Sequence, residues 1–161
     1  MNPAMHPPPS DTITSITSLA CSSLGLVVVD GSVRAGFPSP AEDYSCESLD
    51  ISKILVPHPL ATYLIRAKGD SMVKAGINDD DLLVVDKSLR AASGDIVCAL
   101  VDNYFTVKYL MKKRGAFRLC AGNPTYPDIV PKDGESIEVW GVVTFAITKL
   151  HQLRPLRRNA A

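Results

Sequence analysis

The sequence predicts a mainly β domain of antiparallel strands, and three observations support this prediction. Short apolar segments recur along the chain, and clusters of Gly, Asn, Asp and Pro separate them, as is typical of strands joined by turns. The chain has 161 residues, of which 46% are hydrophobic, so it can bury one core. No internal repeat is present. We therefore expect a single domain with terminal tails.

The elements are expected in the following order. Residues 1–10 contain four prolines and are expected to form an irregular lead. Residues 11–35 fit more than one structure, one of which is a strand at 24–29 that lies across the body. Residues 50–55 are predicted to form one short helix, with Asp50 as its cap. The predicted strands of the body are 61–67, 82–86, 95–101, 104–110, 115–120 and 137–149. The pair Asp102-Asn103 predicts a tight turn between two of them.

Charge and hydropathy exclude several classes of protein. The 17 basic and 17 acidic residues give a formal net charge of zero, whereas a general grip on nucleic acid needs basic patches. We expect no direct sequence-specific DNA binding. The apolar run at 24–29 is far too short to cross a bilayer, and no basic region precedes it, so neither export nor a membrane anchor is expected. The weakly basic segment Arg154–Arg158 is expected to be a solvated tail.

Metal and cofactor sites are not expected. The cysteines show neither Cys-x-x-Cys pairing nor His partners at metal-ligand spacing, so zinc and disulfides are both disfavoured and a reduced, cytoplasmic protein is expected. The run Asp79-Asp80-Asp81 lacks the spacing of a calcium loop and is interpreted as a solvated turn. The cysteines concerned are Cys21, Cys46, Cys98 and Cys120.

Lys108 is the most informative residue, because it is a cation inside a run, 103–110, that reads as a half-buried strand. An apolar setting lowers the pKa of lysine from its ordinary value of about 10.4, which would allow it to act as a general base. Ser71 follows a Gly-Asp turn, which could direct its hydroxyl and the next backbone N–H groups to one point. Together they outline a serine–lysine dyad. The alternative is a turn serine and a lysine that reaches water.

A peptide that a protease could read lies upstream. The bond between Ala35 and Gly36 joins two small residues, follows the apolar Val33, and precedes an extended, proline-punctuated stretch. It is a candidate cleavage site.

Seven short segments form a series with these candidates: Gly36-Phe-Pro-Ser-Pro-Ala41, Ala61-Thr-Tyr63, Gly69-Asp-Ser-Met72, Leu82-Leu-Val-Val-Asp86, Gly94-Asp-Ile-Val97, Phe105-Thr-Val-Lys108 and Trp140-Gly-Val-Val143. The order and spacing of these segments, over most of residues 34–149, resemble those of the self-cleaving S24 peptidases. Within that family the series resembles the UmuD-type accessory proteins of error-prone SOS DNA polymerases.

The resemblance implies a LexA/UmuD-like curled antiparallel β domain with one or two short helices and a flexible N-terminal arm. Residues 1–35 would be the arm that self-cleavage removes, 36–150 the peptidase-like domain and 151–161 a C-terminal tail. It also implies an SOS-response protein whose processed form acts in mutagenic lesion bypass. The implied partners are a second copy in a homodimer, a RecA–single-stranded-DNA filament that triggers cleavage, and a UmuC-like Y-family polymerase subunit.

The dyad chemistry agrees with the roles that the family assigns. Ser71 would attack the carbonyl carbon of Ala35, and neutral Lys108 would take the hydroxyl proton and later protonate the amine of Gly36. The backbone N–H groups of Ser71 and Met72 would form the oxyanion hole.

The chain departs from the UmuD prototype in three respects. The prototype is cut at a Cys-Gly bond, whereas Ala35-Gly36 is the pair that related LexA repressors use. Residues 1–34 do not align with the prototype's short arm. Asp80 stands where relatives often carry Gly, so its turn is expected to be strained or differently built.

Other functions remain as alternatives. One is a non-proteolytic dimeric interaction module. A LexA-like repressor fragment would need an N-terminal helix-turn-helix, which a Pro- and Ser-rich arm cannot supply. A signal peptidase would need a membrane anchor. A Ser-His-Asp triad through His58 has no supporting spacing. Trp140 is expected to pack on the sheet, and Tyr104, Phe105 and Tyr109 to make core or dimer contacts rather than stack on bases.

Overall fold

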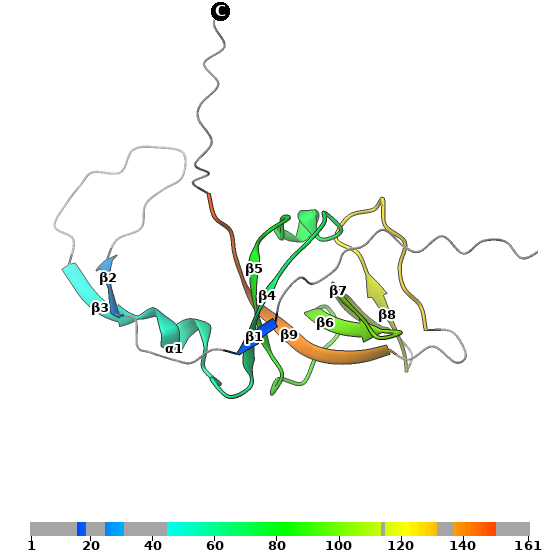
Figure 1. Cartoon of the computed structure of the whole chain (residues 1–161), viewed down its shortest axis with the longest axis horizontal. Coiled ribbons are helices and arrows are strands. Elements are labelled where there is room, and N and C mark those ends of the chain that lie inside the picture. Colours follow the sequence, from blue (N-terminus) through cyan, green and yellow to red (C-terminus); the bar gives the residue numbers. More distant parts are fainter. Residues whose placement is uncertain (1–15, 19–24, 31–44, 114, 132–136, 151–161) are drawn as a thin grey trace, which may run out of the picture.

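A curved antiparallel sheet forms the body of the molecule (Figure 1). The computed structural model describes residues 16–18, 25–30, 45–113, 115–131 and 137–150. A second, two-stranded sheet and a short helix lie to one side of the body in Figure 1. The elements are β1 (Ile16–Ser18), β2 (Gly25–Asp30), β3 (Ser45–Asp50), α1 (Ile51–Leu55), β4 (Thr62–Arg66), η1 (Val73–Ala75), β5 (Leu82–Asp86), β6 (Ile96–Val101), β7 (Tyr104–Lys113), β8 (Ala116–Cys120) and β9 (Ile137–Ile147).

The larger sheet has seven strands in the order β1-β4-β5-β9-β6-β7-β8, and every neighbouring pair is antiparallel. This confirms the predicted fold class. All six predicted strands of the body are present, at bounds within a few residues of those expected. The long strand β9 is central, since one part of it pairs with β5 and another with β6.

The N-terminal region is organised differently from the expectation. A strand does occur where the 24–29 run predicted one, but it pairs with β3 in the separate sheet, not with the strands of the body. Neither β3 nor β1 was predicted. β1 is an edge strand of the larger sheet and pairs with β4, with Ile16 opposite Ile65. The expected lead at 1–10 and the tail at 151–161 lie outside the described residues.

Two local predictions are confirmed. Asp50 caps α1, because its carboxylate accepts the backbone N–H of Ser52 at 3.1 Å. Asp102 and Asn103 have φ values of 46° and 67°, so the β6–β7 turn uses the left-handed region at both central positions, as type I′ hairpins require. The 3₁₀ helix η1 is the second short helix that the fold class allowed.

Gly141 lets β9 cross the sheet closely. A Cβ there would lie 2.7 Å from Val85 Cγ1 and 3.1 Å from the Asp86 carbonyl oxygen. Both ladders of β9 also shift register nearby, on β5 between Val84 and Val85 and on β6 between Cys98 and Ala99. Because such irregularities increase the local twist and bend of a strand, they account for the curl of the sheet.

Two clusters of buried apolar side chains make up the core of the described residues. Ile65, Leu83, Val85 and Cys98 are fully buried members of the first, and Leu110 and Leu119 belong to the second. As expected, Trp140 packs on the sheet, and Phe105 and Tyr109 pack against the same, first cluster. Trp140 also contacts the rings of Phe105 and Tyr63. Tyr104 does not pack in the core: it is 76% exposed, because it begins β7 directly after the β6–β7 turn, and a dimer contact through it stays a prediction.

Candidate active site

Ser71 lies on the loop between β4 and η1 and is buried, with 5% of its surface exposed. Gly69 adopts a positive φ of 87°, which an L side chain disfavours, and so turns the chain after β4. The Val73 N–H donates to the Asp70 carbonyl at 3.2 Å and closes a turn around Ser71 and Met72. The Gly-Asp-Ser-Met sequence therefore folds into a compact turn that presents the hydroxyl to the interior.

Lys108 lies on β7, opposite Val97 of β6, and is 4% exposed. Its Nζ donates to Ser71 Oγ over 2.8 Å and to the Val107 carbonyl over 3.1 Å. The two residues that the sequence paired as a dyad are therefore within hydrogen-bond distance in a buried setting. The prediction that Lys108 is a strand lysine is confirmed.

This contact depends on the curl of the sheet. Three strands, β5, β9 and β6, separate β4 from β7. In a flat sheet the two strands would lie about 19 Å apart, at about 4.8 Å per step. The loop after β4 and the bend of the sheet together close that gap to the 2.8 Å between Nζ and Oγ.

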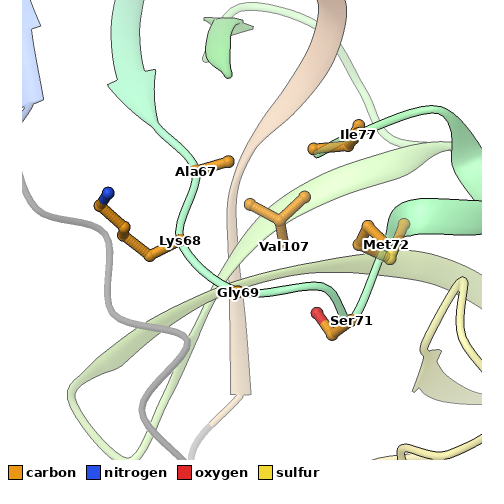
Figure 2. A pocket seen from close by; sticks show the side chains of 7 residues that line it. All are labelled: Ala67, Lys68, Gly69, Ser71, Met72, Ile77 and Val107. Carbon is orange, nitrogen blue, oxygen red and sulfur yellow. The ribbon is translucent and has the colours of Figure 1, made fainter. Parts of the chain in front are cut away.

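A small pocket opens beside Ser71 (Figure 2). In Figure 2 the Ser71 hydroxyl lies at its edge, on the loop that runs from Gly69 to Met72, while the Lys68 side chain points away. Apolar side chains dominate its wall, so the pocket suits a small apolar side chain. Its lining consists of Ala67, Lys68, Gly69, Ser71, Met72, Ile77 and Val107.

Two backbone donors beside the hydroxyl have no protein acceptor within the described residues: the N–H groups of Ser71 and Met72. The Met72 side chain is buried at 3% exposure, and its sulfur accepts the Gly122 N–H at 3.2 Å. Buried backbone N–H groups are normally paired. The two groups are thus available to a ligand oxygen.

Ala35 and Gly36, the candidate cleavage site, lie outside the described residues. The strands on either side of it are described: β1 and β2 precede it, and they pair with β4 and β3, which follow it. The segment before the bond is thus joined to the segment after it by two ladders.

His58 takes no part in a triad with Ser71. Its Nδ1 lies 2.6 Å from Asp86 Oδ2, and the other Asp86 oxygen accepts both the hydroxyl and the N–H of Ser88. Burial raises the pKa of the Asp86 carboxyl, but the hydrogen bonds from Ser88 and His58 outweigh it, and the net pKa is lowered. This cluster is a structural anchor at the end of β5.

The acidic turn at 79–81 supports the loop of Ser71. Asp79 Oδ1 accepts the Gly69 N–H at 2.8 Å, and the buried Asp81 accepts the Asn78 N–H at 2.8 Å. The prediction of a solvated turn is therefore only partly right, because Asp81 is 3% exposed. No group of three His, Cys, Asp or Glu side chains within the described ranges is arranged to hold a metal ion.

Asp80 adopts a φ of 72°, so the expected strain at this position is present. Its carboxylate lies 3.2 Å from both Lys68 Nζ and Arg66 Nη1. The hydrogen bond from Lys68 and the charge of Arg66 lower the pKa of the Asp80 carboxyl. These two cations offset the negative charge of Asp80 in the strained turn.

Cys98 and Cys120 are free thiols, and the side chains of Cys21 and Cys46 are not among the described parts. Burial raises the pKa of the Cys98 thiol to about 12. The Cys98 thiol is thus unreactive in the folded chain. No described helix has the length and apolar character that crossing a membrane requires.

The sequence interpretation missed the segment after β8, which packs against the Ser71 loop. Asn123 and Tyr126 both hydrogen-bond to Asp70, across more than fifty positions of sequence. The only local signal was the dipeptide Asn123-Pro124, which predicts a turn but not its neighbour.

Comparisons of the sequence with known proteins give the family of the chain. The family model described as Peptidase S24-like matches residues 27–144, a range that includes the Ala35–Gly36 bond. The chain is 42% identical over 122 residues to protein ImpA of Salmonella typhimurium, which is 75% of this chain and 82% of ImpA. Its identity is 46% over 115 residues to protein SamA of Salmonella typhimurium and 44% over 116 residues to protein MucA of Escherichia coli. Each of these two matches covers 71% of this chain and 79% of the relative.

Proposed function

Because the chain belongs to the S24 peptidase family, as a member of its UmuD type, we propose that it cleaves its own backbone between Ala35 and Gly36. Family membership makes it a serine peptidase of the autoproteolytic type. Ser71 is the nucleophile and Lys108 the general base. The observation that carries the assignment is the 2.8 Å hydrogen bond between Lys108 Nζ and Ser71 Oγ, both on buried residues.

The reaction begins with the amine of Lys108 in its neutral form. Nζ accepts the Ser71 hydroxyl proton while Oγ bonds to the Ala35 carbonyl carbon. The tetrahedral intermediate then collapses: the bond to the Gly36 nitrogen breaks, and the Lys108 ammonium protonates the departing amine. The neutral amine then deprotonates a water molecule, whose oxygen bonds to the carbonyl carbon of the ester that joins Ala35 to Ser71. The bond to Oγ breaks, and the Lys108 ammonium returns the proton to Oγ, which restores the serine hydroxyl.

Burial of Lys108 supports its role as base. Only 4% of its surface is exposed, and removal from water disfavours the ammonium form. An uncharged amine can accept the hydroxyl proton, whereas an ammonium can only donate. Since the unperturbed pKa of lysine is about 10.4, any activity at neutral pH requires that the site favour the neutral amine.

The oxyanion is held by the two available backbone donors, Ser71 N–H and Met72 N–H. Removal of one such donor elsewhere costs about 2.7–4 kcal/mol of transition-state stabilisation. The small apolar pocket beside Ser71 supports Ala35 as the residue whose carbonyl is attacked, because a methyl group matches its size. Tethering the substrate in the same chain raises its effective concentration, so a wide binding cleft is unnecessary.

The consequence of cleavage is an active accessory subunit. Residues 1–35 form the removable arm, and 36–150 with the tail 151–161 form the processed body. UmuD-type membership supports a homodimeric body that acts with a Y-family polymerase in SOS mutagenesis. We propose that a RecA–single-stranded-DNA filament triggers cleavage. Loss of the arm would open the β4 edge that β1 covers and the β3 edge that β2 covers.

The direct test is self-cleavage of the purified chain, alone at alkaline pH and with a RecA filament at neutral pH, followed by sequencing of the new N-terminus. The parent should yield a fragment that begins at Gly36. Ser71→Ala should abolish it, and Lys108→Arg should abolish the alkaline response, because arginine stays protonated. Matched controls are Ser48→Ala, an exposed serine, and Lys112→Arg, an exposed lysine of the same strand.

Three results would contradict the proposal. A Gly36 fragment from Ser71→Ala would remove Ser71 from the chemistry. A pH-independent rate in the parent would remove Lys108 as base. A cell test separates cleavage from its consequence: a chain that starts at Gly36 and carries Ser71→Ala should support damage-induced mutagenesis, whereas full-length Ser71→Ala should not. Equal mutagenesis from both would favour the non-proteolytic interaction module.

A further inference from the structure

The Ser71 loop is packed against Gly122–Tyr126, a segment that follows β8. The Lys74 N–H donates to the Gly122 carbonyl at 2.9 Å, and the Gly122 N–H donates to Met72 Sδ at 3.2 Å. A Cβ on Gly122 would lie only 3.2 Å from Met72 Cα. The two segments are therefore in close contact directly behind the nucleophile.

Asp70, the residue before the nucleophile, is held from this segment at two points. The Asn123 side-chain amide donates to the Asp70 carbonyl oxygen at 3.1 Å, with a longer contact to its carboxylate. The Tyr126 hydroxyl donates to Asp70 Oδ1. The main chain and the side chain of Asp70 are thus both fixed by residues more than fifty positions away.

The contact to the Asp70 carbonyl is central to the geometry of the site. The same oxygen accepts the Val73 N–H at 3.2 Å and so closes the turn that contains Ser71 and Met72. That turn orients the hydroxyl toward Lys108 and leaves two N–H groups available beside it. A shift of Asp70 would move the nucleophile and both oxyanion donors together.

The holding segment is itself held in shape. Asn123 Oδ1 accepts both the N–H and the hydroxyl of Thr125, and the Tyr126 N–H donates to the Asn123 carbonyl at 3.1 Å. These contacts fix the Asn123 amide with its nitrogen directed at Asp70. Satisfied networks of this kind rigidify a site more than their single bonds suggest.

We infer that Asn123 and Tyr126 are positioning residues for the nucleophile: through Asp70 they hold the Ser71 turn in the geometry that self-cleavage requires. The inference rests on the proposed self-cleavage. The contacts that carry the inference reach Asp70 and not the reacting atoms. Their loss should slow the reaction and leave its dependence on pH unchanged, because the base is untouched.

The experiment measures the rate of alkaline self-cleavage of the full chain across a range of pH, at temperatures well below melting. Tyr126→Phe removes one hydroxyl and keeps the ring, and it should slow cleavage about tenfold, since small misplacements of reacting groups can cost up to about a hundredfold. Asn123→Ala should slow it at least as much. Tyr104→Phe is the matched control, because Tyr104 is 76% exposed, and its rate should equal that of the parent.

A double-mutant cycle separates positioning from general loosening. If Tyr126 acts through Asp70, the combination of Asp70→Ala with Tyr126→Phe should be no slower than Asp70→Ala alone. The inference would be overturned if the losses of cleavage rate multiplied in the double variant. It would also be overturned if Tyr126→Phe cleaved as fast as the parent, or if the midpoint of its rate–pH profile shifted. If Tyr126→Phe melts too low to assay, Asn123→Ala decides, because its contact to the Asp70 carbonyl holds the same turn: a cleavage rate equal to that of the parent, or a shifted midpoint of the pH profile, would overturn the inference. Absence of cleavage in the parent would instead contradict the proposed function.

Discussion

The two halves of the dyad are held in place by different means. Lys108 lies on β7, whose backbone pairs with β6 on one side and β8 on the other. Ser71 lies on a loop held by side chains from two other loops, Asp79 on one side and Asn123 with Tyr126 on the other. A side chain on a paired strand is displaced only when the sheet distorts, whereas the place of a side chain on this loop depends on a few side-chain hydrogen bonds that single mutations can remove.

This difference has a consequence for mutations. Changes in the sheet that carries Lys108, here called the strand half, should act on the stability of the whole domain, because they disturb the sheet and its core. Changes in the Ser71 loop and the segments that hold it, here called the loop half, should act on the cleavage rate with little loss of stability. Four substitutions test that division.

The largest effect is expected for Gly141→Ala, on the strand half. The added Cβ would lie 2.7 Å from Val85 Cγ1 and 3.1 Å from the Asp86 backbone oxygen, so the sheet must open where β9 crosses it. We expect a loss of about 3 kcal/mol in the free energy of unfolding, or a melting temperature lower by about 6–12 °C. Ala116→Val, on the exposed edge of β8, is the control. Equal melting temperatures for Gly141→Ala and the parent would contradict the close crossing.

Cys98 should make the strand half sensitive to alkali. Its thiol pKa rises from about 9 to about 12 on folding, so the stabilisation is complete below pH 9 and is lost as the pH rises toward 12. Within that window, the free energy of unfolding should fall by about 1.4 kcal/mol per pH unit from this group. Denaturant titrations would compare Cys98→Ala with its parent, both carrying Ser71→Ala to prevent cleavage. Identical alkaline slopes would refute the assignment.

Gly122→Ala tests the loop half. Its Cβ would lie 3.2 Å from Met72 Cα and 3.3 Å from Ala75 Cβ, so the turn that carries the oxyanion donors must shift by a few tenths of an ångström. We expect cleavage to slow roughly tenfold, with a melting temperature lower by no more than about 4 °C. Cleavage assays and thermal melts would be run on the same samples. A large fall in melting temperature with an unchanged rate would reverse the proposed division.

The smallest effect is expected for Asp80→Gly. Glycine relieves the left-handed φ of 72°, but the contacts with Lys68 and Arg66 are lost, and the two changes oppose each other. We expect a melting temperature within about 2 °C of the parent at pH 7 and a cleavage rate within about twofold. Because folding lowers the pKa of Asp80 from its ordinary value of 3.8, the ionised carboxylate stabilises the fold above pH 3.8. This stabilisation is lost as the pH falls through the lowered pKa. The variant should therefore gain stability relative to the parent at pH 3; an unchanged difference between pH 7 and pH 3 would contradict this assignment.

Local features determined much of what could be predicted from the sequence. The six strands of the body follow from apolar runs between turn residues, and the β6–β7 turn from Asp102-Asn103, which tolerate positive φ. The cap of α1 follows from Asp50. Lys108 could be singled out because a cation in an apolar strand is unusual. Ser71 follows a Gly-Asp turn, which is common, and it was paired with Lys108 as the best candidate nucleophile upstream.

Tertiary structure alone decided the rest, because the contacts concerned join segments that no local pattern relates. The pairing of β2 with β3 and the place of β1 at the β4 edge depend on which strand edges remain open. The contacts of Asn123 and Tyr126 with Asp70 join loops, which have no hydrophobic period to reveal their neighbours. The dyad itself shares both origins: the sequence supplied its two groups, 37 residues apart, and the curl of the sheet across three intervening strands brought Nζ to within 2.8 Å of Oγ.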